Sequence, residues 1–97
     1  MNVIWTPEAA EDRAKIVAHI RADNPLAAAR MEQLFARAAS RLAEHPRFGR
    51  PGKIPGTREM IPHESYRLVY EINDETVWVL VLVHTARQWP PPTDWKR

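Results

Sequence analysis

Two helix-start signals near the N-terminus constrain the fold of this chain more than any other feature of the sequence. Thr6-Pro7 and Asn24-Pro25 each place a residue that can cap a helix before a proline that suits the first helical position. Alanine-rich segments with apolar residues at helical spacing follow both signals, and they predict helices over residues 7–21 and 25–44. The short connection between them implies an antiparallel helical hairpin.

The rest of the chain has the pattern of β-structure interrupted by one loop. Residues 46–56 hold all three glycines of the sequence and three of its nine prolines, which favours turns. Strands are expected at residues 2–5, 57–61, 66–72 and 76–84. The last of these is almost continuously apolar, which predicts a central strand buried on both sides. The order β-α-α-β-β-β predicts an α+β fold with the helical hairpin on one face of a small, largely antiparallel sheet.

The alternation of side chains along neighbouring strands predicts which residues share a face of the sheet. Within strand 66–72, the apolar set should meet the helices; it consists of Tyr66, Leu68, Tyr70 and Ile72. Arg67 takes the other face. An even-numbered hairpin loop after this strand places Arg67 with His84, whereas an odd-numbered loop places it with the valines of the last strand. The even loop is preferred because it puts the slender valines under the helices, so Arg67 and His84 are expected to converge on the uncovered face.

Both of these residues also have a purely structural interpretation. Arg67 can form a surface ion pair with Glu64 or Glu71, and such pairs stabilise a fold by roughly 0–1 kcal/mol. A histidine at a strand end, such as His84, often bonds a carbonyl and does nothing else. Two interpretations therefore remain open: Arg67 and His84 form a functional surface together, or each has only a structural role.

Composition limits the class of protein. The 97 residues suggest a single domain over 1–97, with 90–97 as a proline-rich tail. The lack of cysteine excludes a disulfide framework and fits a cytoplasmic protein. The histidines show no metal-ligand spacing, so neither a metal nor a cofactor is expected. The N-terminus does not have the pattern of a signal peptide and the longest apolar run is too short to span a bilayer, so we expect a soluble protein without a membrane partner.

Positive charge is concentrated in the middle of the chain. The formal net charge is only +2, but residues 47–67 carry five Lys and Arg side chains against two Glu side chains. A basic segment of this kind is either a solvated loop or a surface that binds an anionic partner.

Three motifs, in order along the chain, resemble the RelE/ParE superfamily of toxins from bacterial type II toxin–antitoxin systems. Residues 42–52 read LAEHPRFGRPG, which is similar to the family's hP..Grp loop. Residues 56–72 (GTREMIPHESYRLVYEI) are similar to its G.Re......Y.i.Y.i strand pair, and residues 77–87 (VWVLVLVHTAR) to its last strand ending in H..R. The resemblance covers nearly the whole chain and implies a growth-inhibiting toxin that a cognate antitoxin neutralises.

The RelE-like branch of the family would make the chain a ribosome-dependent endoribonuclease that cuts mRNA. Cleavage through the 2′-hydroxyl needs a base, an acid and cations that hold the developing charge. The resemblance then implies catalysis by Arg67, His84 and Arg87, and nucleic-acid or target binding by Lys53, Arg58 and Trp89. His84 would carry the proton because imidazole titrates near neutrality, and Trp89 would stack on a base. The sequence departs from many nucleases, which carry more lysines in the central loop and a tyrosine after the last strand.

The ParE-like branch poisons DNA gyrase and is not known to cleave RNA. The GRP loop and the H..R ending favour this branch, so gyrase inhibition is the preferred prediction and mRNA cleavage the alternative. The basic loop and the tail from Trp89 to Trp95 would then contact gyrase, and the terminal Lys96-Arg97 would follow this tail to the partner. His84 would be structural. Alternatively, Trp89 covers the open end of the core. A further interpretation is an inactive module that binds an antitoxin and poisons nothing.

The antitoxin is expected to lay a helix in the groove between the alanine-rich helices and the sheet, with addition of a strand at a sheet edge as an option. Val17 and Met31, on the apolar stripes of the two helices, are the residues predicted to bind it.

Overall fold

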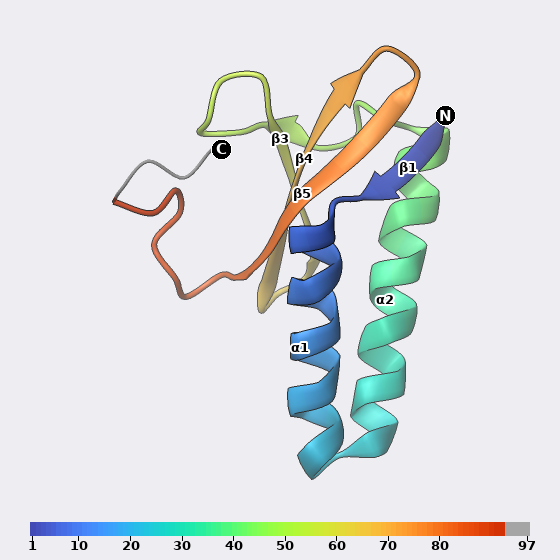
Figure 1. Ribbon diagram of the computed structural model, residues 1–97, viewed down its shortest axis with the longest axis vertical. Helices are drawn as coiled ribbons and strands as arrows, with labels where there is room; N and C mark the ends of the chain where they lie inside the picture. The colour runs from blue at the N-terminus through green and yellow to red at the C-terminus, as the bar shows by residue number, and fades with distance from the viewer. Residues whose placement is uncertain (93–97) are drawn as a thin grey trace.

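Residues 1–92, which the computed structural model describes, form two helices packed on one face of a five-stranded sheet (Figure 1). The elements in chain order are β1 (Asn2–Trp5), α1 (Pro7–Asp23), α2 (Pro25–Glu44), β2 (Arg50–Pro51), β3 (Arg58–His63), β4 (Tyr66–Asn73) and β5 (Thr76–His84). Both helices begin where predicted, because the side chains of Thr6 and Asn24 accept amide N–H bonds from the first turns (3.1 and 3.0 Å). The α+β fold class is thereby confirmed.

The strand order in the sheet is β1-β5-β4-β3-β2, so β5 is an inner strand as its apolar sequence predicted. Strand β1 pairs with β5 in parallel, and the other pairs are antiparallel. Strand β2 was not predicted. It consists of Arg50 and Pro51, paired with Glu59 and Arg58, and two residues are too few to produce a periodic pattern.

The core lies between the helices and the sheet. The buried positions of α2 recur at helical spacing: Ala28, Met31, Phe35, Ala38 and Leu42. Val17 of α1 is 3% exposed and Met31 is 9% exposed, and both belong to this core. The sheet therefore covers the apolar helix stripe that suggested a free groove, and binding of an antitoxin at these two residues stays a prediction.

The β4–β5 hairpin has the predicted even-numbered loop, Asp74-Glu75, but the register changes along the strands. The register that starts at the loop continues as far as Tyr70, which lies opposite Val79. The next residue of β4, Val69, lies opposite Val81. Leu80 is therefore an extra residue on β5, a β-bulge. Because side chains alternate with a period of two, one extra residue inverts which side chains of β5 face the helices.

The bulge separates the two side chains that were expected to converge. Beyond it, Arg67 lies opposite Val83 and His84 lies opposite Tyr66. The Tyr66 ring contacts Phe35 of α2 edge-on, with centroids 5.9 Å apart, so Tyr66 and His84 are on the helix side of the sheet. Arg67 takes the opposite face. The prediction of a shared face is wrong, although the loop length behind it is correct.

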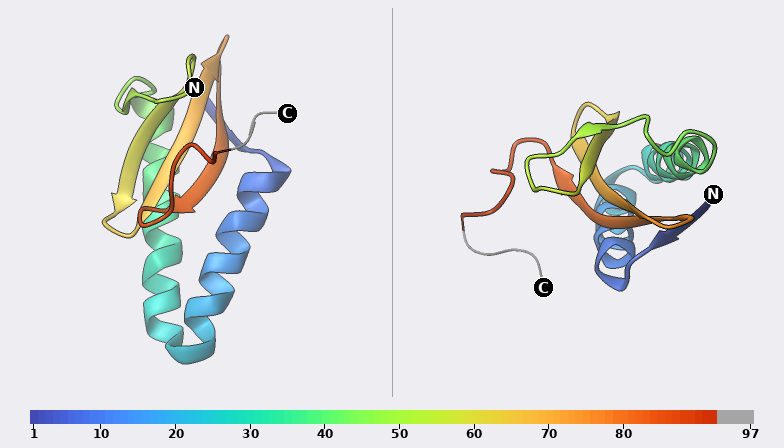
Figure 2. Two further views of the ribbon diagram at one scale, coloured as in Figure 1. Left: turned by 90° about the vertical axis from the view of Figure 1, so that its left-hand side faces the viewer. Right: turned by 90° about the horizontal axis from the view of Figure 1, so that it is seen from above.

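Residues 85–92 follow β5 and lie beside the face of the sheet that the helices leave uncovered (Figure 2). Trp89 is 5% exposed in this segment. Trp89 is therefore buried within the protein, which argues against a Trp89 that stacks on a base or contacts a target; the core between the helices and the sheet does not include it. The predictions for Trp95 and Lys96-Arg97 fall outside the described residues. Within residues 1–92, neither helix has the length and the hydropathy needed to cross a membrane.

Candidate functional site

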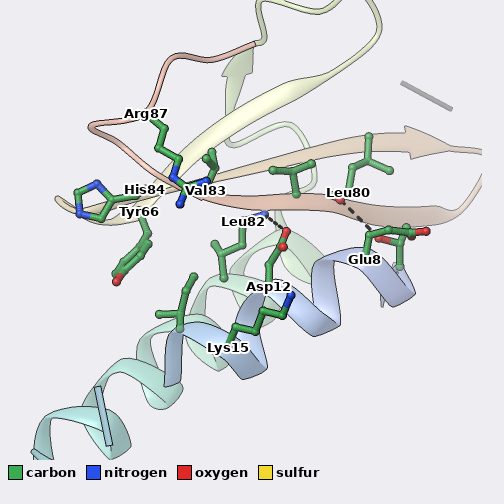
Figure 3. A pocket seen from close by; sticks show the side chains of 12 residues that line it. Glu8, Asp12, Lys15, Tyr66, Leu80, Leu82, Val83, His84 and Arg87 are labelled. Carbon is green, nitrogen blue, oxygen red and sulfur yellow. Dashed lines mark hydrogen bonds between the residues drawn. The ribbon is translucent and has the colours of Figure 1, made fainter. Parts of the chain in front are cut away.

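The residues proposed for catalysis lie on two separate surfaces. His84 and Arg87 line a pocket between α1 and the end of β5, which we call the edge pocket (Figure 3). Arg67 lies on the uncovered face of the sheet, next to the segment that leads from α2 into β3. We call that segment, residues 47–58, the cationic loop.

The edge pocket exists because β1 is shorter than β5. Strand β1 ends at Trp5, opposite Val79, and in the described part of the chain helix α1 flanks β5 from Leu80 onwards. Thr6 bonds this edge through its amide N–H, which donates to the Val79 carbonyl oxygen (3.0 Å), and through its hydroxyl, which donates to that of Leu80 (3.5 Å). The remaining cavity measures about 820 Å³ and has both apolar and charged walls.

Asp12 of α1 caps the open edge of β5. Its Oδ2 accepts the Leu82 amide N–H at 3.2 Å, in place of a neighbouring strand. Burial raises the pKa of the Asp12 carboxyl above its usual 3.8, against the lowering effects of the Leu82 N–H bond and of Lys15 and Arg87, while Glu11 adds to the increase. The ionised carboxylate is thus held at some cost to the fold.

Asp12→Asn is expected to become more stable relative to the wild type as the pH rises. The native state binds the Asp12 proton more tightly than the unfolded chain, so this group's contribution is fully present below 3.8 and is lost as the pH rises through the raised pKa. Asparagine keeps an oxygen that can accept the Leu82 N–H and does not titrate. Urea unfolding of both proteins from pH 3 to pH 7 measures the difference, and a constant difference over that range would contradict the assignment.

His84 is held in a way that does not suit a general base. Its Nδ1 accepts the amide N–H of Ala86 at 3.0 Å, so the neutral ring carries its proton on Nε2 and its lone pair is already occupied. The ring also contacts Tyr66 edge-on, with centroids 5.4 Å apart. His63 makes the equivalent bond, with Nδ1 accepting the Ser65 N–H at 3.0 Å. These contacts describe a structural histidine at the end of a strand.

Arg67 forms a buried ion pair with Glu59, not with the Glu64 or Glu71 considered from the sequence alone. Its Nε lies 3.6 Å from Glu59 Oε1, and Arg50 Nη2 lies 4.0 Å from the same oxygen. Glu59 is only 2% exposed. The charge of Arg67 is therefore already balanced inside the protein. Sequence reasoning missed Glu59, although an acid opposite Val69 is a diagonal neighbour of Arg67 once β3 and β4 are aligned.

The start of the cationic loop is fixed by two side chains of the sheet. The buried hydroxyl of Tyr70 donates to the Pro46 carbonyl oxygen (2.7 Å) and accepts the Gly49 amide N–H (2.9 Å). Arg58 donates to the carbonyl oxygens of Gly49 (2.7 Å) and Arg47 (3.4 Å). Arg58, predicted to bind a target, thus makes internal bonds that shape the loop.

Three cations of the loop remain on the surface: Arg47, Arg50 and Lys53 are exposed. Phe48 lies among them, also exposed, and the guanidinium of Arg41 stacks on its ring at 4.8 Å. Of the residues predicted to bind a target, Lys53 is the one that the described structure leaves exposed in this loop. No group of three or more potential metal ligands occurs within residues 1–92.

Comparisons with known proteins find a toxin family and individual toxins that are similar to this chain. A family model described as "ParE toxin of type II toxin-antitoxin system, parDE" matches residues 3–89. The chain is 39% identical over 90 residues to "Putative toxin Y4kP" of Sinorhizobium fredii, covering 92% of this chain and 93% of that protein. It is 35% identical over 86 residues to "Toxin RelE2" of Caulobacter vibrioides, covering 89% and 97%.

A solved structure titled "Chromosomal ParDE TA system from P. aeruginosa" has the same fold. It superposes with a TM-score of 0.75 at 22% sequence identity, over 87% of this chain and 95% of that chain.

Proposed function

Since this chain belongs to the ParE toxin family of type II toxin–antitoxin systems, we propose that it inhibits growth by poisoning DNA gyrase. As a toxin of such a system it is partnered by an antitoxin. What the proposal adds is the target, gyrase rather than the ribosome with its mRNA, and the surface that contacts it, the cationic loop.

The separation of Arg67 from His84 carries the choice of target. RNA cleavage needs a base, an acid and cations around one phosphate. Here the arginine is paired with buried Glu59 on one face of the sheet, and the histidine has its lone pair occupied on the other side. A gyrase poison needs only a surface that binds its target, and the exposed cations of the loop supply one.

A supercoiling assay tests the proposal directly. Purified toxin is added to gyrase, relaxed plasmid and ATP, and the products are separated after protease treatment. We expect inhibited supercoiling and linear DNA from trapped cleavage complexes. In cells, expression without an antitoxin should cause filamentation and an SOS response.

Reversing the charge of two loop cations is expected to weaken gyrase inhibition by about 10- to 100-fold, because rim cations set both the encounter rate and the fit to an acidic surface. The variant is Arg47→Glu with Lys53→Glu. The matched control is Arg30→Glu with Arg37→Glu, which changes the net charge equally at two exposed positions of α2. Equal weakening of both double variants would contradict a role of the loop and indicate a general effect of charge.

His84→Gln distinguishes the two targets. Under gyrase poisoning its potency should stay within about twofold of the wild type, whereas loss of a proton carrier lowers a rate by roughly 10²–10⁴. Cut ribosome-bound mRNA, unchanged plasmid topology and a large loss in His84→Gln would favour the RelE-like alternative. A chain that binds an antitoxin but inhibits neither process would be the inactive module.

A further inference from the structure

Glu59 is a buried carboxylate beneath the cationic loop, and its two oxygens do different things. Oε2 accepts the amide N–H of Lys53 at 3.1 Å, and Oε1 faces the guanidinium groups of Arg67 and Arg50. We propose that Glu59 is a positioning residue for the target, which holds the loop in the shape that presents Lys53 and its neighbours to gyrase. The inference rests on the proposed function and adds the residue that prepares the surface.

The packing of residues 52–57 shows that the loop closes directly onto this carboxylate. A Cβ at Gly52 would lie 3.2 Å from Glu59 Oε2 and would collide with the Thr57 hydroxyl. The Gly52 N–H donates to the Thr57 carbonyl oxygen (2.7 Å), and the Thr57 hydroxyl donates to that of Ile54 (2.6 Å). The tip is thus a closed turn, and the Lys53 amide is its bond to the sheet.

The bond between the Lys53 amide and Glu59 affects binding of a target, because a loop that is mobile before association must be ordered on binding, which costs free energy. Tyr70 and Arg58 hold the first residues of the loop, and strand β3 begins at its end. Glu59 holds the middle, where Lys53 extends into solvent. A loop that keeps its shape before gyrase arrives does not have to be ordered by gyrase.

The two tasks of Glu59 require a carboxylate. A glutamine amide offers one oxygen and one NH2 group, so it cannot accept from the Lys53 N–H and face two guanidinium groups at once. The guanidinium groups attract the oxygen more strongly because they are charged. In Glu59→Gln the NH2 group therefore faces the Lys53 amide, and the tip of the loop loses this bond to the sheet.

The decisive comparison is Glu59→Gln against Arg67→Gln. Both variants break the buried ion pair and lower stability, but Arg67→Gln keeps the carboxylate that binds the Lys53 N–H. At a temperature where circular dichroism shows both folded, we expect Glu59→Gln to inhibit gyrase about tenfold less and Arg67→Gln to stay within about threefold of the wild type. Hydrogen exchange at residues 52–57 should accelerate in Glu59→Gln alone.

A second pair of variants keeps the test decisive if Glu59→Gln does not fold. Lys53→Pro removes the N–H and leaves the ion pair, while Lys53→Ala removes the same charge and keeps the N–H. Lys53→Pro should inhibit about tenfold less than Lys53→Ala. Equal potency within this pair, or equal loop exchange in Glu59→Gln and Arg67→Gln, would overturn the positioning role. A wild-type protein that leaves gyrase unaffected would instead refute the proposed target.

Discussion

Replacing Arg67 with alanine is expected to lower the free energy of unfolding by about 3–5 kcal/mol, the cost of leaving one member of a buried ion pair without its partner. Glu59 is 2% exposed in the intact protein, and without Arg67 its nearest remaining cation would be Arg50 at 4.0 Å. The total free energy of unfolding of a domain is roughly 5–15 kcal/mol, so this loss is a large part of it. Urea unfolding monitored by circular dichroism measures the loss.

Lys15→Ala provides the contrast in burial. Lys15 and Glu11 form an ion pair of similar length, 3.8 Å, but their side chains are 74% and 69% exposed. This variant should lose no more than about 1 kcal/mol. If Arg67→Ala lowered the free energy of unfolding as little as Lys15→Ala, the ion pair with Arg67 would not be what stabilises the buried Glu59 carboxylate. The comparison also affects how activity data are interpreted, because a weaker toxin in Arg67→Ala follows from unfolding and does not by itself identify a catalytic arginine.

Removing the hydroxyl of Tyr70 is expected to destabilise the protein by about 2–4 kcal/mol and to loosen the start of the cationic loop. Tyr70→Phe leaves the Gly49 N–H without its buried acceptor and the Pro46 carbonyl oxygen without its donor, and each such group costs about 1–3 kcal/mol. Burial raises the pKa of the Tyr70 phenol, which keeps the hydroxyl protonated as a donor. Thermal unfolding and hydrogen exchange at Gly49 report the two effects.

Tyr66→Phe is the matched control for Tyr70→Phe. Both tyrosines lie on β4 and face the helices, but Tyr66 is partly exposed and its ring contacts are aromatic. Loss of its hydroxyl is expected to cost less than about 1 kcal/mol. A similar small loss in both variants would show that the Tyr70 hydroxyl bonds do not determine the shape of the loop.

The fold was predictable because its signals are local. Each helix start depends on a capping side chain and a proline within four residues, and both starts were found at the correct residue. The element order and the family motifs are likewise properties of the linear chain. Together they specify an α+β toxin fold.

The candidate site was less predictable because its geometry depends on one residue of register. The even hairpin loop was anticipated, yet the bulge at Leu80 placed His84 on the opposite side of the sheet from Arg67. A bulge has no short sequence signature comparable to a helix cap. The burial of Val17 and Met31 was not predicted for a related reason: an apolar helix stripe looks the same in the sequence whether a sheet or a partner covers it.

The sequence by itself therefore determined the two helices, the four longer strands, their order, and the toxin family to which the chain belongs. Only the tertiary structure decided that Arg67 is neutralised by Glu59, that Trp89 is buried, and that three cations of the loop remain exposed. The physical reason is distance along the chain. Capping acts between residues a few positions apart, whereas ion pairing and burial depend on strands and segments that only the complete fold brings together.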